Sequence, residues 1–320
     1  MKALIIGAGG FVGSYLITEL SENRGWSVCA TKLPTESIHI ESACDIFDLD
    51  ILSEGDISEP IAKTRPDCIF HLAAQSSVAV AWEKPALTVD INVKGCVNLL
   101  EAVRKSGTKP RVILIGSSEE YGYAAAEQAY LSENTVPKPG NIYALTKYTQ
   151  NLIGQIYCKA YKMDIIAVRA FNHIGPGQSP QFVVSDFCKQ AAEIELGLKE
   201  PVVCVGNLSA ERDFTDVRDI VRAYAEISLK GKCGETYNVG SGKAVSIEKI
   251  LKIILSLSSK GIQVVIDKNR FRPVDTPKIE ADIFGLTTDT AWLPQIELKD
   301  SVSDIFEYWR SELSGKERTL

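Results

Sequence analysis

Residues 1–16, MKALIIGAGGFVGSYL, contain an apolar run that leads directly into a glycine-rich loop. The apolar residues 3–6 predict a buried β-strand, and residues 13–23 predict the helix that follows it. Gly7, Gly10 and Gly13 allow a tight turn and let a pyrophosphate approach the backbone and the first amides of the helix. The third glycine stands one position later than in G-x-G-x-x-G, because Val12 occupies that position. We interpret the loop as a dinucleotide site; the alternative is a glycine turn that only packs the helix against the strand.

Strand-length apolar runs alternate with helical patterns on either side of this loop, as in βαβ units on a parallel sheet. We predict further strands at 27–31, 68–72, 111–116 and 164–169, and helices at 86–105 and 143–161. After residue 171 the pattern changes to a stretch rich in glycine and proline. We predict a helix at 183–198 and a short strand at 201–206 after it. The pattern predicts an α/β fold, a Rossmann-type doubly wound parallel sheet with a smaller C-terminal α/β substrate lobe. The dinucleotide-binding domain would span 1–170 plus about 217–245, and the substrate domain 171–216 and 246–320.

Composition narrows the class of protein. Of 320 residues, 45 % are apolar and 24 % are charged, and the net charge is −6, which disfavours disorder and a nucleic-acid or anionic-membrane partner. The eight cysteines and three histidines are scattered without a metal-binding spacing, so we predict no metal site. We interpret the cysteines as small buried apolar residues in a reducing compartment. The apolar start is too short for a signal sequence or a membrane span, which predicts a cytoplasmic protein.

Thr31 and Lys32 stand at the end of the second predicted strand, where a carboxylate would hold the ribose of NAD. A cation there favours a 2′-phosphate, so we expect NADP(H) in preference to NAD(H), unless Lys32 only faces solvent. Asp50 and Ile51 fit the acidic–apolar pair that brackets an adenine, or equally an ordinary helix N-cap. The expected cofactor contacts are Gly7, Gly10, Phe11, Val12, Gly13, Thr31, Lys32, Asp50, Ile51, Leu72, Ala73 and Ala74, with Tyr143 and Lys147.

Tyr143 and Lys147 stand four residues apart in YALTK, so both project from the same face of the predicted helix. An ammonium beside the phenol would lower the pKa of Tyr143 and make it a proton donor or acceptor. Ser117 follows a predicted strand, at the edge of the sheet where α/β proteins bind ligands, and could hydrogen-bond a reacting oxygen. Each feature alone is weak, whereas the glycine loop, the strand-end serine and YxxxK in this order are specific.

These motifs resemble those of the extended short-chain dehydrogenase/reductases that modify nucleotide sugars, over nearly the whole chain. FNHIGPGQSPQFVVSDFCKQ, GSSEEYG and VGNLSAERDFTDVRDIVRAY resemble the GDP-4-dehydro-6-deoxy-D-mannose reductases, whereas HLAAQSSVAVAWEKP also resembles the GDP-mannose 4,6-dehydratases. The first resemblance implies NADPH-dependent reduction of a C4 ketone to GDP-D-rhamnose, with Ser117, Tyr143 and Lys147 as catalytic residues. It also implies a GDP-sugar site that includes Ser76, Ser118, Asn172, Val183, Asn207, Arg212 and Arg272.

Glu119 distinguishes the two activities. In the dehydratases a Ser/Thr-x-Glu triplet supplies the base that removes the C5 proton, and residues 117–119 fit that triplet. The chain is shorter than those enzymes and has TKLPTES where they have an arginine pair, which favours the reductase over a dehydratase or a bifunctional enzyme. In a reductase Glu119 would only shape the sugar pocket.

A third hypothesis is a non-catalytic sensor, which is disfavoured because Tyr143 and Lys147 are both present. The resemblance also implies a homodimer built on the helices at 86–105 and 143–161.

Overall fold

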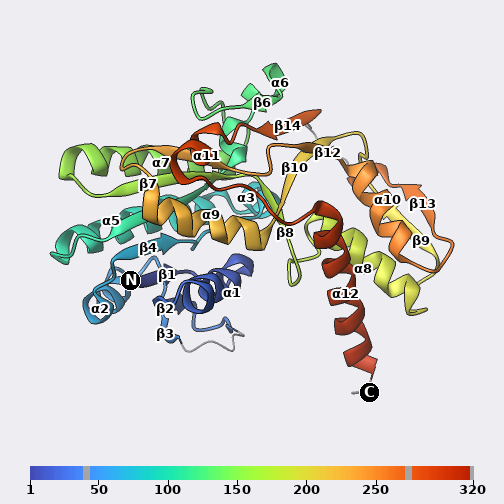
Figure 1. Cartoon of the computed structure of the whole chain (residues 1–320), viewed down its shortest axis with the longest axis horizontal. Helices are drawn as coiled ribbons and strands as arrows, with labels where there is room; N and C mark the ends of the chain where they lie inside the picture. The colour runs from blue at the N-terminus through green and yellow to red at the C-terminus, as the bar shows by residue number, and fades with distance from the viewer. Residues whose placement is uncertain (39–43, 271–275, 318–320) are drawn as a thin grey trace.

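A seven-stranded parallel sheet forms the larger part of the molecule in the computed structural model, which describes residues 1–38, 44–270 and 276–317 (Figure 1). The sheet order is β11-β7-β5-β4-β1-β2-β3, so the strand order reverses between β1 and β4. Its strands are β1 (Lys2–Ile6), β2 (Ser27–Lys32), β3 (Asp45–Asp48), β4 (Cys68–His71), β5 (Arg111–Ser117), β7 (Ile165–Ala170) and β11 (Thr236–Val239). This arrangement confirms the expected Rossmann-type doubly wound sheet.

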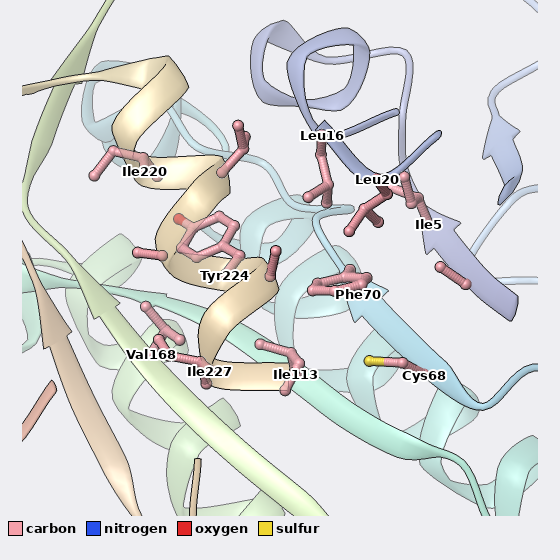
Figure 2. Packing of buried hydrophobic residues seen from close by; sticks show 14 of the residues in the cluster. Ile5, Leu16, Leu20, Cys68, Phe70, Ile113, Val168, Ile220, Tyr224 and Ile227 are labelled. Carbon is pink, nitrogen blue, oxygen red and sulfur yellow. The ribbon is translucent and has the colours of Figure 1, made fainter. Parts of the chain in front are cut away.

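Helices cover both faces of this sheet. α1 (Phe11–Thr18), α9 (Val217–Lys230) and α11 (Phe284–Thr290) pack on one face, and α2 (Glu54–Thr64), α5 (Gly95–Lys105) and α7 (Ile142–Tyr161) pack on the other. Successive residues of a strand point to opposite faces of the sheet. Ile5 therefore packs in the core beneath α1, α9 and α11, and Leu4 packs in the core beneath α2, α5 and α7. Figure 2 shows Tyr224 and Ile227 of α9 packed over the strands. A fully buried aliphatic side chain such as Ile227 contributes about 1.5–3 kcal/mol.

Two predicted helices are divided. The helix expected at 13–23 begins earlier as α1 and continues as a π-helical turn, Glu19–Asn23. The helix expected at 86–105 consists of α4 (Pro85–Val89), a π-helical turn (Asp90–Lys94) and α5, and α3 (Val78–Glu83) precedes it. The π-turn brings Asn92 inward, where its Nδ2 donates to Thr146 Oγ1 on α7 at 3.0 Å.

The remaining elements build a smaller α/β lobe. Its sheet contains β12 (Ala244–Ser246), β10 (Glu211–Asp216), β14 (Lys278–Ala281), β6 (Tyr130–Leu131) and β8 (Asn172–Ile174), and β9 (Val202–Val205) pairs with β13 (Gln263–Ile266). α8 (Val183–Glu195), α10 (Ile247–Leu257) and α12 (Leu298–Glu317) surround a separate core around Phe187, Ile250 and Phe306 (Figure 1). α6 (Ala124–Glu127) and β6 belong to the segment between β5 and α7, yet β6 pairs with β14. The predicted domain boundaries stay a prediction.

Membrane-spanning helices and metal-binding clusters are both absent from the part of the chain that the structure describes. Within ranges 1–38, 44–270 and 276–317, no helix has the length and apolar character needed to cross a membrane. The same ranges contain no group of three or more His, Cys, Asp or Glu side chains that could hold a metal ion.

Candidate functional site

The glycine-rich loop lies between β1 and α1, at the carboxyl edge of the large sheet. Gly7 has φ +84°, and a Cβ there would come within 2.5 Å of the Ala73 backbone; a Cβ on Gly13 would collide with Ala8. These two glycines are therefore needed for packing. At Gly10 the nearest atom to an added Cβ is 3.9 Å away, so open space lies above it.

The start of α1 fits an anionic group. Gly10 is its N-cap, and in this described segment no side chain caps the helix and no acidic residue occupies its first turn. The Gly13 amide donates to Gly10 O at 3.1 Å, so the amides of Phe11 and Val12 are the ones that can meet an anion, and the helix dipole favours negative charge there. The open space above Gly10 and these amides fit the pyrophosphate of a dinucleotide.

Thr31 and Lys32, at the end of β2, are both engaged by the protein. Thr31 is buried, and its Oγ1 accepts a hydrogen bond from the Gly7 amide at 3.1 Å, so it holds the loop in place. Lys32 Nζ lies 2.6 Å from Asp48 Oδ1, its register partner on β3. Glu36 accepts a hydrogen bond from the Leu33 amide, and its carboxylate covers Gly9. Sequence reasoning missed Asp48 and Glu36, because strand pairing and a turn bring them here and no spacing motif marks them.

The other expected cofactor residues follow β3 and β4. Asp50 is exposed and its Oδ1 accepts from the Leu52 amide at 2.9 Å, whereas Ile51 is buried against Gly95 of α5. The amides of Leu72 and Ala73 both donate to Ile6 O, which places the segment 72–74 beside the glycine loop. Phe11 and Val12, in the first turn of α1, are half-buried.

Ser117 and Tyr143 meet at the carboxyl end of β5. Asn141 caps α7 by accepting from the Ala144 amide at 2.8 Å, which fixes Tyr143 in the first turn. The Ser117 side chain neighbours the Tyr143 phenol, and Ser117 Oγ accepts from the Glu119 amide at 3.2 Å. One turn further along α7, the buried Lys147 Nζ donates to Ile115 O at 2.7 Å. All three predicted catalytic side chains therefore lie around the end of β5.

The expected effect of Lys147 on Tyr143 is wrong. Burial is the main cause that raises the pKa of Tyr143 to about 12; the neighbouring Ser117 hydroxyl acts against it, and the charges of Glu119 and Glu120 act with it. Burial also lowers the pKa of Lys147 to about 8, against the opposing effect of Glu120. The reason is that both side chains leave water and the ammonium points at the Ile115 carbonyl. Tyr143 is thus a neutral phenol at neutral pH, and its raised pKa makes it a weaker acid than an exposed tyrosine.

Two adjacent glutamates beside Ser117 have different environments. Glu119 is half-buried, and its Oε2 accepts from Asn141 Nδ2 at 3.3 Å. Glu120 is fully buried: its Oε1 accepts from the Ser117 amide at 3.1 Å and its Oε2 from Arg169 Nε of β7 at 3.0 Å. Sequence reasoning missed Glu120, although Ser117 and Glu120 have the spacing of a capping box, in which the glutamate accepts from the N-cap amide.

The expected sugar-nucleotide residues are spread over both lobes. Asn172 and Arg212 lie on the paired strands β8 and β10, and Val183 begins α8. Asn207 follows β9, and its Oδ1 accepts from the Ser209 amide at 3.0 Å. The remaining members are Ser118, half-buried beside Ser117; Ser76, exposed after β4; and Arg272, which lies outside the described residues.

Comparison with known proteins identifies the family of this chain. The family model described as GDP-mannose 4,6 dehydratase matches residues 4–305. The chain belongs to the GDP-mannose 4,6 dehydratase family. It is 30% identical to the GDP-6-deoxy-D-mannose reductase of Pseudomonas aeruginosa, over 98% of this chain and 98% of that protein. It is 26% identical to the GDP-mannose 4,6-dehydratase of Yersinia enterocolitica, over 95% of this chain and 92% of that protein.

Solved structures of relatives share the fold of this family member. RMD from Pseudomonas aeruginosa, complexed with NADPH, superposes with a TM-score of 0.86 at 28% identity, covering 97% of this chain and 100% of that chain. The UDP-glucose 4-epimerase of Thermus thermophilus, in complex with NAD, has a TM-score of 0.85 at 25% identity, covering 97% and 99%. These findings confirm the resemblance to nucleotide-sugar enzymes of the short-chain dehydrogenase/reductase type. They are also consistent with a nicotinamide dinucleotide, NADP(H) preferred and NAD(H) possible.

Proposed function

We propose that the chain is an NADPH-dependent reductase that converts the C4 ketone of GDP-4-dehydro-6-deoxy-D-mannose to GDP-D-rhamnose. The observation that carries this proposal is the convergence of Ser117, Tyr143 and Lys147 at the carboxyl end of β5. A ketone reduction needs a proton donor at this place, and a neutral phenol can supply the proton. The likeness to the Pseudomonas reductase supports the same choice.

Each residue at the end of β5 has a distinct part in the reaction. Ser117 Oγ accepts a hydrogen bond from the Glu119 amide, which leaves its hydroxyl proton free to be donated to the ketone oxygen. Tyr143 donates its phenolic proton to that oxygen as negative charge develops on it. Lys147 holds the nicotinamide ribose. When bound, the reduced dinucleotide supplies the hydride to C4, so hydride and proton together complete the alcohol.

The residues that would hold the cofactor and the sugar nucleotide follow from their positions. The amides at the start of α1 bind the pyrophosphate, and Lys32 binds the 2′-phosphate after it leaves Asp48. Arg212 grips the diphosphate of the GDP-sugar, since a guanidinium can bind two oxygens at once, and Asn172 on the neighbouring strand hydrogen-bonds the sugar.

Gly10→Ala tests the pyrophosphate site without disturbing the fold. The added methyl group enters open space and the backbone at Gly10 is extended, with φ −79°, so the melting temperature should stay unchanged. Because the methyl group occupies the space above the loop, NADPH should bind at least about tenfold more weakly, a loss of about 1.4 kcal/mol. Titration of nicotinamide fluorescence measures this. Gly55→Ala, in open space on α2, is the control and should retain full affinity; equal affinity in both variants would place the pyrophosphate elsewhere.

The choice between reductase and dehydratase is tested with two substrates. Purified protein should oxidise NADPH when given the pre-made 4-keto sugar, and should form no 4-keto-6-deoxy sugar from GDP-mannose alone. Glu119→Gln keeps the size and the hydrogen-bonding oxygen of a side chain next to Asn141, so the variant should keep ketone reduction within about tenfold. Conversion of GDP-mannose by the wild type, lost in Glu119→Gln, would instead establish the dehydratase. Turnover that depends on either sugar nucleotide would exclude the hypothesis of a non-catalytic sensor.

We also propose that two copies of the chain associate through α4 and α7. These helices contact each other and expose the apolar side chains Leu87, Val89, Leu145, Leu152 and Ile156. Exposed apolar side chains gathered on one face are typical of interaction surfaces. Sedimentation equilibrium should give the mass of a homodimer, and a monomer at micromolar concentration would contradict this.

A further inference from the structure

Two cysteines that stand far apart in the sequence meet beside the large sheet. The Sγ atoms of Cys158 and Cys233 are 3.3 Å apart, although 75 positions separate them in the chain. Cys158 is half-buried near the end of α7, and Cys233 is exposed in the turn before β11. The expectation that every cysteine is a buried apolar residue is therefore wrong for this pair. It holds for Cys29, Cys68, Cys96 and Cys188.

The turn that carries Cys233 is held rigidly against its surroundings. The Glu235 amide donates to Lys232 O at 3.2 Å, and Gly234 has φ +84°, the conformation that a type II turn requires at its third position. The Gly234 amide also donates to Ile165 O of β7 at 2.8 Å. A Cβ on Gly234 would lie 3.3 Å from Cys158 Sγ. The fold thus brings both thiols together before any reaction.

We infer that Cys158 and Cys233 form a covalent modification site, at which a peroxide closes a reversible disulfide between α7 and the turn before β11. A disulfide needs its sulfur atoms about 2.05 Å apart. The thiols must therefore approach by about 1.2 Å.

The reaction balances with peroxide as the named oxidant. Cys233 is the more exposed thiol and meets the peroxide first, although burial and the neighbouring Cys158 raise its pKa. Its thiolate attacks a peroxide oxygen; the O–O bond breaks, water leaves with the proton, and a sulfenic acid remains on Cys233. Cys158 then attacks the Cys233 sulfur, the S–S bond forms, and the S–O bond breaks to release a second water with the Cys158 proton. Two sulfurs lose two electrons in total, and the peroxide gains them. A dithiol reductant reverses the change.

The crosslink joins the helix of the proposed catalytic residues to the edge of the sheet. α7 carries Tyr143 and Lys147 at its beginning and Cys158 near its end, while β11 is the edge strand beside β7. Closing a loop of this length restricts the unfolded chain, so the disulfide form should be the more stable one. In a protein of this size we expect the melting temperature to rise by a few degrees.

The experiment treats the purified full-length protein with hydrogen peroxide and then blocks the remaining thiols. Intact-protein mass spectrometry should show two fewer free thiols, and peptide mapping should recover one linked pair that contains Cys158 and Cys233. Dithiothreitol should restore both thiols and the lower melting temperature. Cys158→Ser and Cys233→Ser should each prevent the crosslink. Cys204→Ser is the matched control, because Cys204 is also partly exposed but lies on β9, and it should still form the crosslink.

Three results would overturn the inference. They are a sulfinic acid on Cys233 with Cys158 unchanged, a disulfide between two different molecules, and a crosslink that persists in Cys158→Ser. The test uses no sugar nucleotide and no dinucleotide, so its outcome is independent of the proposed reductase activity.

Discussion

Replacing Tyr143 with phenylalanine should lower kcat for ketone reduction by about 10²–10⁴-fold, the usual contribution of a positioned general acid. The substitution removes one hydroxyl group from a buried side chain and leaves the ring packed at the start of α7. The proton that the developing alkoxide needs is then missing. NADPH binding should change little, because the glycine loop and Lys147 are untouched. Steady-state kinetics with the 4-keto sugar, beside fluorescence titration of NADPH, measures both quantities.

Tyr148→Phe provides the control for this prediction on the same helix. It makes the same chemical change at a half-buried tyrosine that has no part in the proposed reaction. It should therefore keep wild-type turnover. Turnover of Tyr143→Phe near the wild-type rate would show that another group donates the proton, and the proposed mechanism would be wrong.

Arg169→Met should produce the largest loss of stability. Arg169 is 5% exposed and Glu120 is fully buried, and Arg169 Nε lies 3.0 Å from Glu120 Oε2. Without the guanidinium the Glu120 carboxylate stays buried and has lost its cation, which costs about 3–5 kcal/mol in comparable pairs. Urea unfolding followed by circular dichroism measures the free energy of unfolding directly. Arg310→Met, which removes an exposed partner of Glu307, should leave it nearly unchanged.

A double variant separates the buried charge from the lost packing. In Arg169→Met with Glu120→Gln the amide oxygen can still accept from the Ser117 amide, and no unpaired charge remains. Much of the lost stability should return. The single variant should also recover as the pH falls toward 4.5: burial raises the pKa of Glu120, so the folded state binds a proton more readily than the unfolded one. A deficit that is independent of pH and of Glu120→Gln would indicate that packing, not charge, is responsible.

The elements of the large sheet could be predicted because their signals are local. The strands predicted at 27–31, 68–72, 111–116 and 164–169 all form within one or two residues of the expected bounds, since a buried parallel strand appears as a short continuous apolar run. Helix continuity was harder to predict. The π-helical turn Asp90–Lys94 divides one expected helix, and the inward contact of Asn92 with Thr146 depends on α7, far along the chain.

In the candidate site, too, some features have local sequence signals and others depend on residues far away in the chain. The helical spacing of Tyr143 and Lys147 and the position of Ser117 after a strand were enough to predict that the three side chains share one region. The direction of the Tyr143 pKa was not predictable, because it depends on how completely folding buries the phenol and on where the Lys147 ammonium points. The Lys32–Asp48 pair was also missed, since it arises from the register of β2 against β3.

The amino-acid sequence by itself determined the doubly wound sheet, the glycine loop at its switch point and the order of the candidate catalytic residues. Each of these features is recognised from residues that stand close together in the sequence, so the periodicity and spacing of side chains are sufficient to predict it. Only the tertiary structure decided the burial that raises the pKa of Tyr143, the buried pair of Glu120 and Arg169, and the contact between Cys158 and Cys233. The partners in the last two lie 49 and 75 positions apart. Their distance and burial depend on the packing of the whole chain, which no local pattern records.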